Sequence, residues 1–137
     1  MKTNVKFNFG IFFLLLFVVA GCTEDNYSLG ELTAPNNVVI TADVVGKDAT
    51  HPDGDGSGKV NFMVTGNNIL GSKIDYDSTD PNDWVILPNS NKATATFKTE
   101  TAARVNTYTV TVITSGVGGT STTVTTTVTV LTLKKDI

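Results

Sequence analysis

Apolar and polar residues alternate with a period of two along most of the chain after residue 36. Val60, Phe62 and Val64 alternate with polar neighbours, and a later segment alternates valine with threonine. This period is typical of β-strands that bury one face. The alternation and the turn residues between segments predict seven strands, over residues 37–45, 59–65, 69–76, 84–87, 92–99, 107–112 and 122–133.

The last predicted strand changes face along its length. Val124, Val128 and Val130 fall on one side, whereas Leu131 and Leu133 fall on the other. Such a shift indicates a β-bulge or a change of strand partner near Val130. Seven short strands with no helix predict an all-β fold, an immunoglobulin-like antiparallel β-sandwich of about seven strands over residues 37–133.

The first 21 residues have a different pattern. Lys2 and Lys6 precede an apolar run over residues 7–19, which is shorter than the roughly 20 residues of a membrane-spanning helix. The run ends in Val19-Ala20-Gly21-Cys22, which resembles the lipobox of bacterial lipoproteins. The resemblance implies a signal peptide at residues 1–21, cleavage before Cys22, and lipidation of Cys22, for example by palmitate.

Residues 22–36 are polar and contain Pro35, and they are expected to form a tether between the lipid and the domain. Glu24 and Asp25 resemble the surface-export signal of lipoproteins in glycan-harvesting Gram-negative bacteria. The expected location is therefore the surface of the bacterial outer membrane, reached through the lipid anchor on Cys22.

The composition of the chain limits the partners and activities that we expect. The chain has 137 residues and a formal charge of −3, and it has no basic patch, so nucleic acid is not expected as a partner. Cys22 is the only cysteine and His51, in a turn-rich stretch, is the only histidine. No catalytic constellation is evident, and we expect neither an enzyme nor a cofactor.

Acidic residues offer two places to look for a metal. Asp53, Asp55 and Ser57 match the first positions of a calcium-binding loop, but the position that requires a bidentate glutamate is Val64. A second acidic cluster lies within residues 75–83 and consists of Asp75, Asp77, Asp80 and Asp83. This segment is expected to be a solvated loop. We therefore predict no metal site.

A ligand-binding face is the remaining chemical candidate. Trp84, the only tryptophan, follows the acidic loop that contains Asp80 and Asp83, and Tyr76 precedes it. An exposed aromatic ring beside carboxylates can stack on a sugar; the alternative is that Trp84 packs at the end of the sandwich.

Two segments resemble the polycystic kidney disease (PKD) domain family. They are Asn106-Thr107-Tyr108-Thr109-Val110-Thr111-Val112, before a glycine-rich hairpin, and the loop and strand of residues 53–62. The family turn aromatic-Asp-aromatic-Gly-Asp-Gly is matched only in part by residues 74–80. The resemblance covers about residues 35–133 and implies an immunoglobulin-like sandwich, in which a tyrosine at the place of Tyr108 commonly bonds a corner of the backbone.

Such domains occur in surface lipoproteins of glycan-degrading bacteria and beside secreted glycoside hydrolases. The sequence therefore predicts a non-catalytic spacer or interaction module at the cell surface, with a polysaccharide or another surface protein as its partner. The alternatives are a glycan-binding lipoprotein and an N-terminal accessory domain separated from a glycoside hydrolase.

Overall fold

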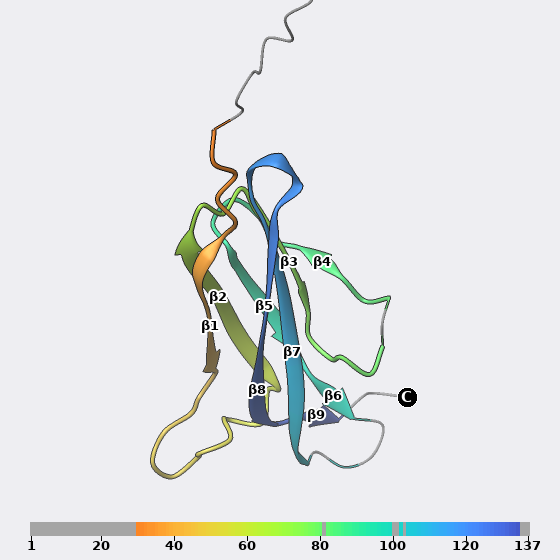
Figure 1. Ribbon diagram of the computed structural model, residues 1–137. Helices are drawn as coiled ribbons and strands as arrows, with labels where there is room; N and C mark the ends of the chain where they lie inside the picture. Colours follow the sequence, from red (N-terminus) through yellow and green to blue (C-terminus); the bar gives the residue numbers. More distant parts are fainter. Residues whose placement is uncertain (1–29, 81, 100–101, 103, 135–137) are drawn as a thin grey trace, which may run out of the picture. The chain divides into compact units, whose positions relative to one another are not determined.

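The computed structural model describes residues 30–80, 82–99, 102 and 104–134. Most of these residues form two antiparallel sheets that face each other (Figure 1). The first sheet has the order β1-β2-β5, formed by Asn36–Val44, Lys59–Asn67 and Lys92–Thr96. The second has the order β4-β3-β7-β8, formed by Val85–Ile86, Gly71–Asp75, Val105–Ser115 and Ser121–Leu131. These strands confirm the predicted immunoglobulin-like all-β sandwich.

Three further elements, two short strands and a 3-10 turn, complete the secondary structure of the described residues. Strands β6 (Lys98–Thr99) and β9 (Leu133–Lys134) form a short parallel pair. A single 3-10 turn, η1 (Val117–Gly119), lies in the hairpin between β7 and β8. No helix in the described residues is long and apolar enough to cross a membrane.

The core follows the predicted alternation. In β2, the side chains of Val60, Phe62 and Val64 are at most 2% exposed, and their neighbours face solvent. Val110 and Val112 of β7 meet them from the second sheet and are fully buried. Burial of apolar surface on this scale is the main stabilising force for a domain of this size.

The predicted change of face near Val130 is a change of strand partner. Strand β8 ends at Leu131, and Thr132 is fully buried with its hydroxyl donating a 2.7 Å hydrogen bond to the carbonyl of Arg104. The amide of Leu133 then donates to the carbonyl of Phe97 at 3.0 Å. The chain therefore leaves β7 and joins β6, at the place where the predicted strand 92–99 also divides in two.

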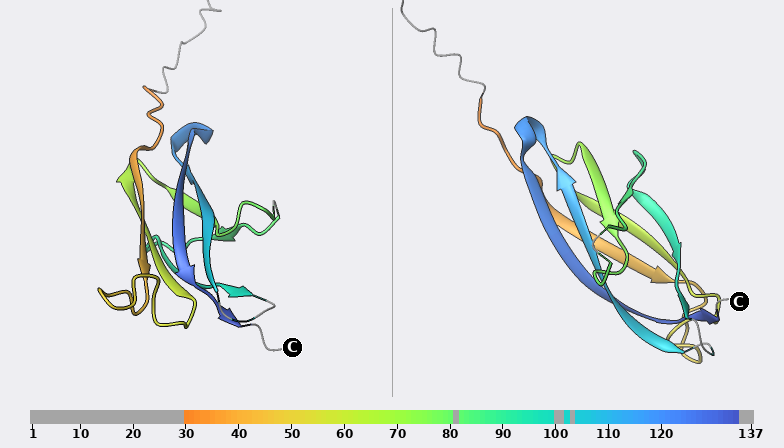
Figure 2. Two further views of the ribbon diagram at one scale, coloured as in Figure 1. Left: turned by 90° about the horizontal axis from the view of Figure 1, so that it is seen from below. Right: turned by 90° about the vertical axis from the view of Figure 1, so that its right-hand side faces the viewer.

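The chain enters the sandwich at one end and leaves it at the other. Buried Pro35, just before β1, accepts a hydrogen bond from the hydroxyl of Thr122 at the start of β8. Strand β9 follows the opposite end of β8 (Figures 1 and 2). Strand β1 begins at Asn36, beside the predicted boundary at residue 37. The predicted signal peptide and Cys22 lie outside the described residues.

Candidate functional site

A cleft of about 320 Å³ opens between the loop that follows β3 and the junction of β5 with β6. Its lining combines aromatic, acidic and basic side chains, namely Tyr76, Asp77, Asp83, Ala95, Thr96, Phe97, Lys98 and Tyr108. The loop between β3 and β4 projects from the sandwich (Figure 2), and it supplies Tyr76, Asp77 and Asp83 to the lining.

Stacked aromatic rings link the cleft to the core. Tyr108 stacks on Phe97, with ring centroids 4.4 Å apart and an interplanar angle of 28°. Phe97 contacts Phe62 edge to face at 6.4 Å, and Phe62 meets Tyr76 at 5.3 Å. Aromatic pairs at these separations contribute beyond the area they bury. The two tyrosines are therefore anchored on one side and partly open on the other.

Neither cleft tyrosine has a hydrogen-bond partner for its hydroxyl among the described residues. The corner bond that a tyrosine at this place commonly makes in immunoglobulin-like folds is therefore not formed within that part of the chain. Burial raises the pKa of the Tyr76 hydroxyl, and burial together with the charge of Asp77 raises the pKa of the Tyr108 hydroxyl. Both remain neutral near pH 7, able to donate and to accept.

The acidic loop is built by its own carboxylates. Asp75, buried at the end of β3, accepts a hydrogen bond from the amide of Asp77 at 3.0 Å. Asp77 accepts from the amide of Thr79 at 3.1 Å, and Asp80 accepts from the amide of Asn82 at 3.2 Å. Aspartates commonly hold turns in this way. Their spacing therefore sets the shape of the loop beside the cleft.

The structure brings together only half of the predicted ligand-binding residues. Tyr76 and Asp83 line the cleft, whereas Asp80 and Trp84 do not. The half-buried Trp84 lies near β3, where the ammonium of exposed Lys73 sits 4.7 Å from the ring centroid. Since Lys73 covers one ring face, Trp84 makes an intramolecular cation–π contact.

Sequence reasoning did not assign five of the lining residues to a site, namely Ala95, Thr96, Phe97, Lys98 and Tyr108. The only signal for Phe97 was a large ring after two alanines in an alternating strand, which indicated burial alone. A second hollow, of about 550 Å³, also went unnoticed on the outer face of the first sheet. It is lined by Thr41, Asp43, Asn61, Phe62, Met63, Lys92, Ala93 and Thr94, and the ring of Phe62 is buried beneath it.

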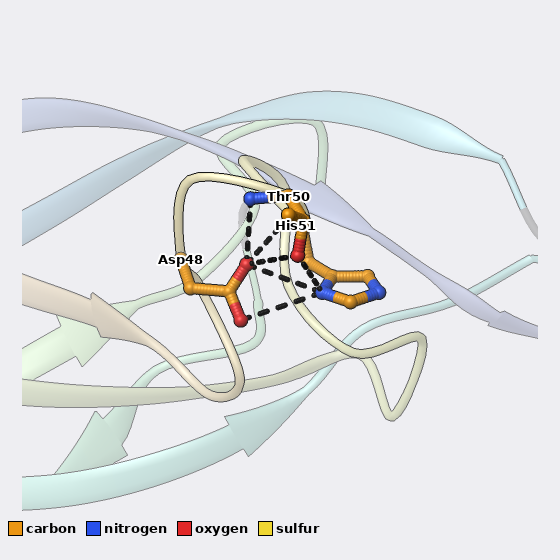
Figure 3. A network of polar contacts seen from close by, with 3 residues as sticks. All are labelled: Asp48, Thr50 and His51. Carbon is orange, nitrogen blue, oxygen red and sulfur yellow. Dashed lines mark hydrogen bonds and ion pairs between the residues drawn. The ribbon is translucent and has the colours of Figure 1, made fainter.

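The only histidine belongs to a compact polar network in the loop between β1 and β2 (Figure 3). The carboxylate of Asp48 accepts hydrogen bonds from the amide of Thr50 at 2.8 Å, from its hydroxyl at 2.8 Å, and from the amide of His51 at 2.7 Å. These bonds hold the pKa of Asp48 at about 2, the hydroxyl of Thr50 contributing most.

This network resembles a nucleophile, base and acid in composition but not in geometry. A catalytic triad uses one imidazole nitrogen for the nucleophile and the other for the acid. Here the same nitrogen, Nδ1 of His51, faces the hydroxyl of Thr50 at 2.9 Å and the carboxylate of Asp48 at 3.2 Å. All three side chains are exposed on one loop, and they stabilise its turn.

The glycine-rich end of the same loop is also held by side-chain hydrogen bonds. Asp55 accepts a 2.9 Å bond from the amide of Ser57, and the pKa of Asp55 is lowered by its hydrogen bonds with Ser57. Within the residues described, no three His, Cys, Asp or Glu side chains gather in a way that would hold a metal ion.

Comparisons with protein-family models, with curated proteins and with solved structures found no match to this chain.

Proposed function

We propose that this chain is a lipid-anchored, non-catalytic module of PKD type that acts as a spacer or interaction domain on the surface of the bacterial outer membrane, in a glycan-utilisation setting. The observation that supports the proposal best is the path of the chain through the sandwich. It enters beside the start of β8 and leaves beyond the end of β8. Whatever precedes the domain is therefore held about one strand length, roughly 35 Å, from whatever follows it.

The anchor in this proposal rests on the leader. The apolar run and the sequence Val19-Ala20-Gly21-Cys22 supply the features that lipoprotein processing requires. Two or more acyl chains, at roughly 0.8 kcal/mol for each buried CH₂, hold a protein stably at a membrane. The non-catalytic character is supported by the geometry at His51, whose Nδ1 faces both potential partners.

Metabolic labelling tests the anchor. Cells that express the full chain are grown with radiolabelled palmitate, and the protein is followed through membrane fractionation. We expect label and membrane association in the wild type, loss of both in Cys22→Ser, and retention of both in the neighbouring control Thr23→Ser. An unlabelled wild-type protein would contradict the proposal.

The cleft favours a second function, glycan binding. Sugar rings offer apolar faces to aromatic side chains and hydroxyls to polar groups, and the cleft presents both at Tyr76 and Tyr108. The carboxylate of Asp83 and the ammonium of Lys98 lie on the same lining. The two tyrosine hydroxyls, which have no hydrogen-bond partner among the described residues, are the groups that such a ligand would satisfy.

Affinity gels containing single polysaccharides separate the two functions. If the cleft binds a glycan, Tyr76→Ala weakens retardation at least tenfold, whereas Trp84→Ala, a change outside the cleft lining, leaves it unchanged. Loss of retardation in Trp84→Ala alone would indicate that the glycan binds at the outer side of β3 instead. No retardation in any polysaccharide would leave the spacer function and remove the second candidate.

A further inference from the structure

Strand β8 is a long edge strand without the usual protection. It spans Ser121–Leu131 and pairs with β7 on one side only. Its sequence contains no charged residue and no proline, and its ladder with β7 runs without a register shift. Edge strands of soluble proteins are normally blunted by charge, proline, bulges or shortness, because unpaired backbone groups accept another strand.

The hydrogen bonds at the end of β8 show which of its backbone groups face outward. The amide of Thr132 donates to Arg104, on the β7 side, at 2.9 Å, whereas the amide of Leu131 donates to Asp53, on the other side, at 2.7 Å. Successive residues of an antiparallel strand alternate in direction. The odd-numbered residues of β8 therefore point their amide and carbonyl groups away from β7.

No strand pairs with the middle of this edge among the described residues. Pro35 meets the hydroxyl of Thr122 at one end of β8, and Asp53 meets Leu131 at the other. Strand β1 belongs to the facing sheet; it lies beside β8 but forms no ladder with it. Among the described residues, no strand forms a ladder with the outward backbone groups between these ends, at Thr123, Thr125, Thr127 and Thr129.

The amino-acid sequence of this middle segment is the same in both directions. Its sequence is Thr123-Val124-Thr125-Thr126-Thr127-Val128-Thr129, which is symmetric about Thr126. An antiparallel copy centred on Thr126 places Val124 opposite Val128 and Thr125 opposite Thr127. The outward-facing odd residues then pair only with odd residues, as the ladder requires, and a two-fold axis passes through the non-hydrogen-bonded pair at Thr126.

We propose that β8 is a self-association edge, at which a second copy of this chain adds its own β8 antiparallel about Thr126. The two four-stranded sheets then become one continuous sheet. On its outer face threonine lies opposite threonine, a pairing that already exists within the domain, where the hydroxyls of Thr107 and Thr129 are 2.8 Å apart. Such cross-strand pairs contribute roughly 0.2–1 kcal/mol each. On the inner face, valine meets valine.

Cysteine cross-linking of the full chain in cell membranes tests this register. In the double variant Thr123→Cys/Thr129→Cys, each cysteine lies opposite its counterpart in the second copy, at a Cα separation of about 5.5 Å, which a disulfide spans. In either single variant the two copies of the cysteine lie six residues apart along the strands, roughly 20 Å. All of these positions are exposed on β8, so the single variants are matched controls.

After mild oxidation we expect at least tenfold more disulfide-linked dimer from the double variant than from either single variant or from the wild type, which carries Cys22 alone. Adding Thr125→Lys and Thr127→Lys to the double variant places lysine opposite lysine and should abolish the dimer. Equal cross-linking in the single and double variants, or cross-linking that survives the two lysines, would overturn the proposal. So would its absence from all variants.

Discussion

Removing the hydroxyl of Thr132 should destabilise the domain, because this one group makes hydrogen bonds to two other residues. Thr132 is fully buried where the chain passes from β8 to β9. Its hydroxyl donates to the carbonyl of Arg104 at 2.7 Å and accepts from the side-chain amide of Asn106 at 3.2 Å. Thr132→Val keeps the shape but removes both bonds, while the carbonyl of Arg104 keeps the bond from the amide of residue 132 and the side chain of Asn106 keeps its bond to that carbonyl. Each intramolecular hydrogen bond contributes about 0.5–1.5 kcal/mol, so we expect the loss of these two to cost about 2 kcal/mol.

Ser72→Ala is the matched control, since it also removes a buried hydroxyl. Ser72 lies in β3, and within the described residues its hydroxyl has no hydrogen-bond partner. Its removal relieves a desolvation cost, so the free energy of unfolding should be unchanged or should rise by up to about 1 kcal/mol. Urea unfolding followed by tryptophan fluorescence measures both variants. The reasoning is refuted if Thr132→Val unfolds at the wild-type midpoint, or if Ser72→Ala loses as much stability as Thr132→Val.

Three more outcomes follow from single sites. Gly58→Ala should destabilise the domain by more than 1 kcal/mol, because Gly58 has a φ of +69° and an added Cβ would meet the carbonyl of Phe97 and, at 2.8 Å, the amide of Leu133. Gly119→Ala, with a φ of +77° and no atom within 4 Å of the added Cβ, should cost less, as urea midpoints would show. Phe62→Ala should cost about 3–5 kcal/mol in the same assay. The pKa of Asp48 is lowered from 3.8 to about 2, so its ionised carboxylate stabilises the fold above pH 3.8. This contribution disappears as the pH falls through 2. Carboxyl NMR titration should show that pKa, and Asp48→Asn should flatten the acid side of the stability profile.

The strands were predictable because the sandwich buries one face of each strand along most of its length. A period of two therefore survives in the sequence from β1 to β8, and Val60, Phe62 and Val64 identify the buried face without any tertiary information. The predicted change near Val130 was located to within two residues. Its nature was not predictable, since the partner that β9 joins, β6, is more than thirty residues away in the sequence.

The candidate site was less predictable because it depends on contacts between sheets. Tyr76 and Asp83 come from the segment that the sequence singled out, whereas Phe97 and Tyr108 reach the cleft from β5–β6 and β7. The sequence offered both an exposed and a packed Trp84, and only the register of β3 beside β4 places Lys73 over its ring. The acidic spacing was visible, but its use in turns appears only when the amide of Asp77 is seen to point back at Asp75.

If the chain is anchored to a membrane by lipid and also pairs through β8, the direction of β8 limits how two copies can meet. The chain enters beside the start of this strand, so a two-fold axis through Thr126 puts the entering ends of two copies at opposite ends of the pair. Two upright neighbours on one membrane run in the same direction and cannot form the antiparallel pair. Pairing on one membrane therefore requires the strands to lie along the surface, whereas copies on two facing membranes pair while both remain upright. Mixing cells that carry Thr123→Cys with cells that carry Thr129→Cys distinguishes these arrangements. Cross-linked dimer from mixed cells indicates pairing between facing membranes, and dimer only on co-expression indicates pairing within one membrane.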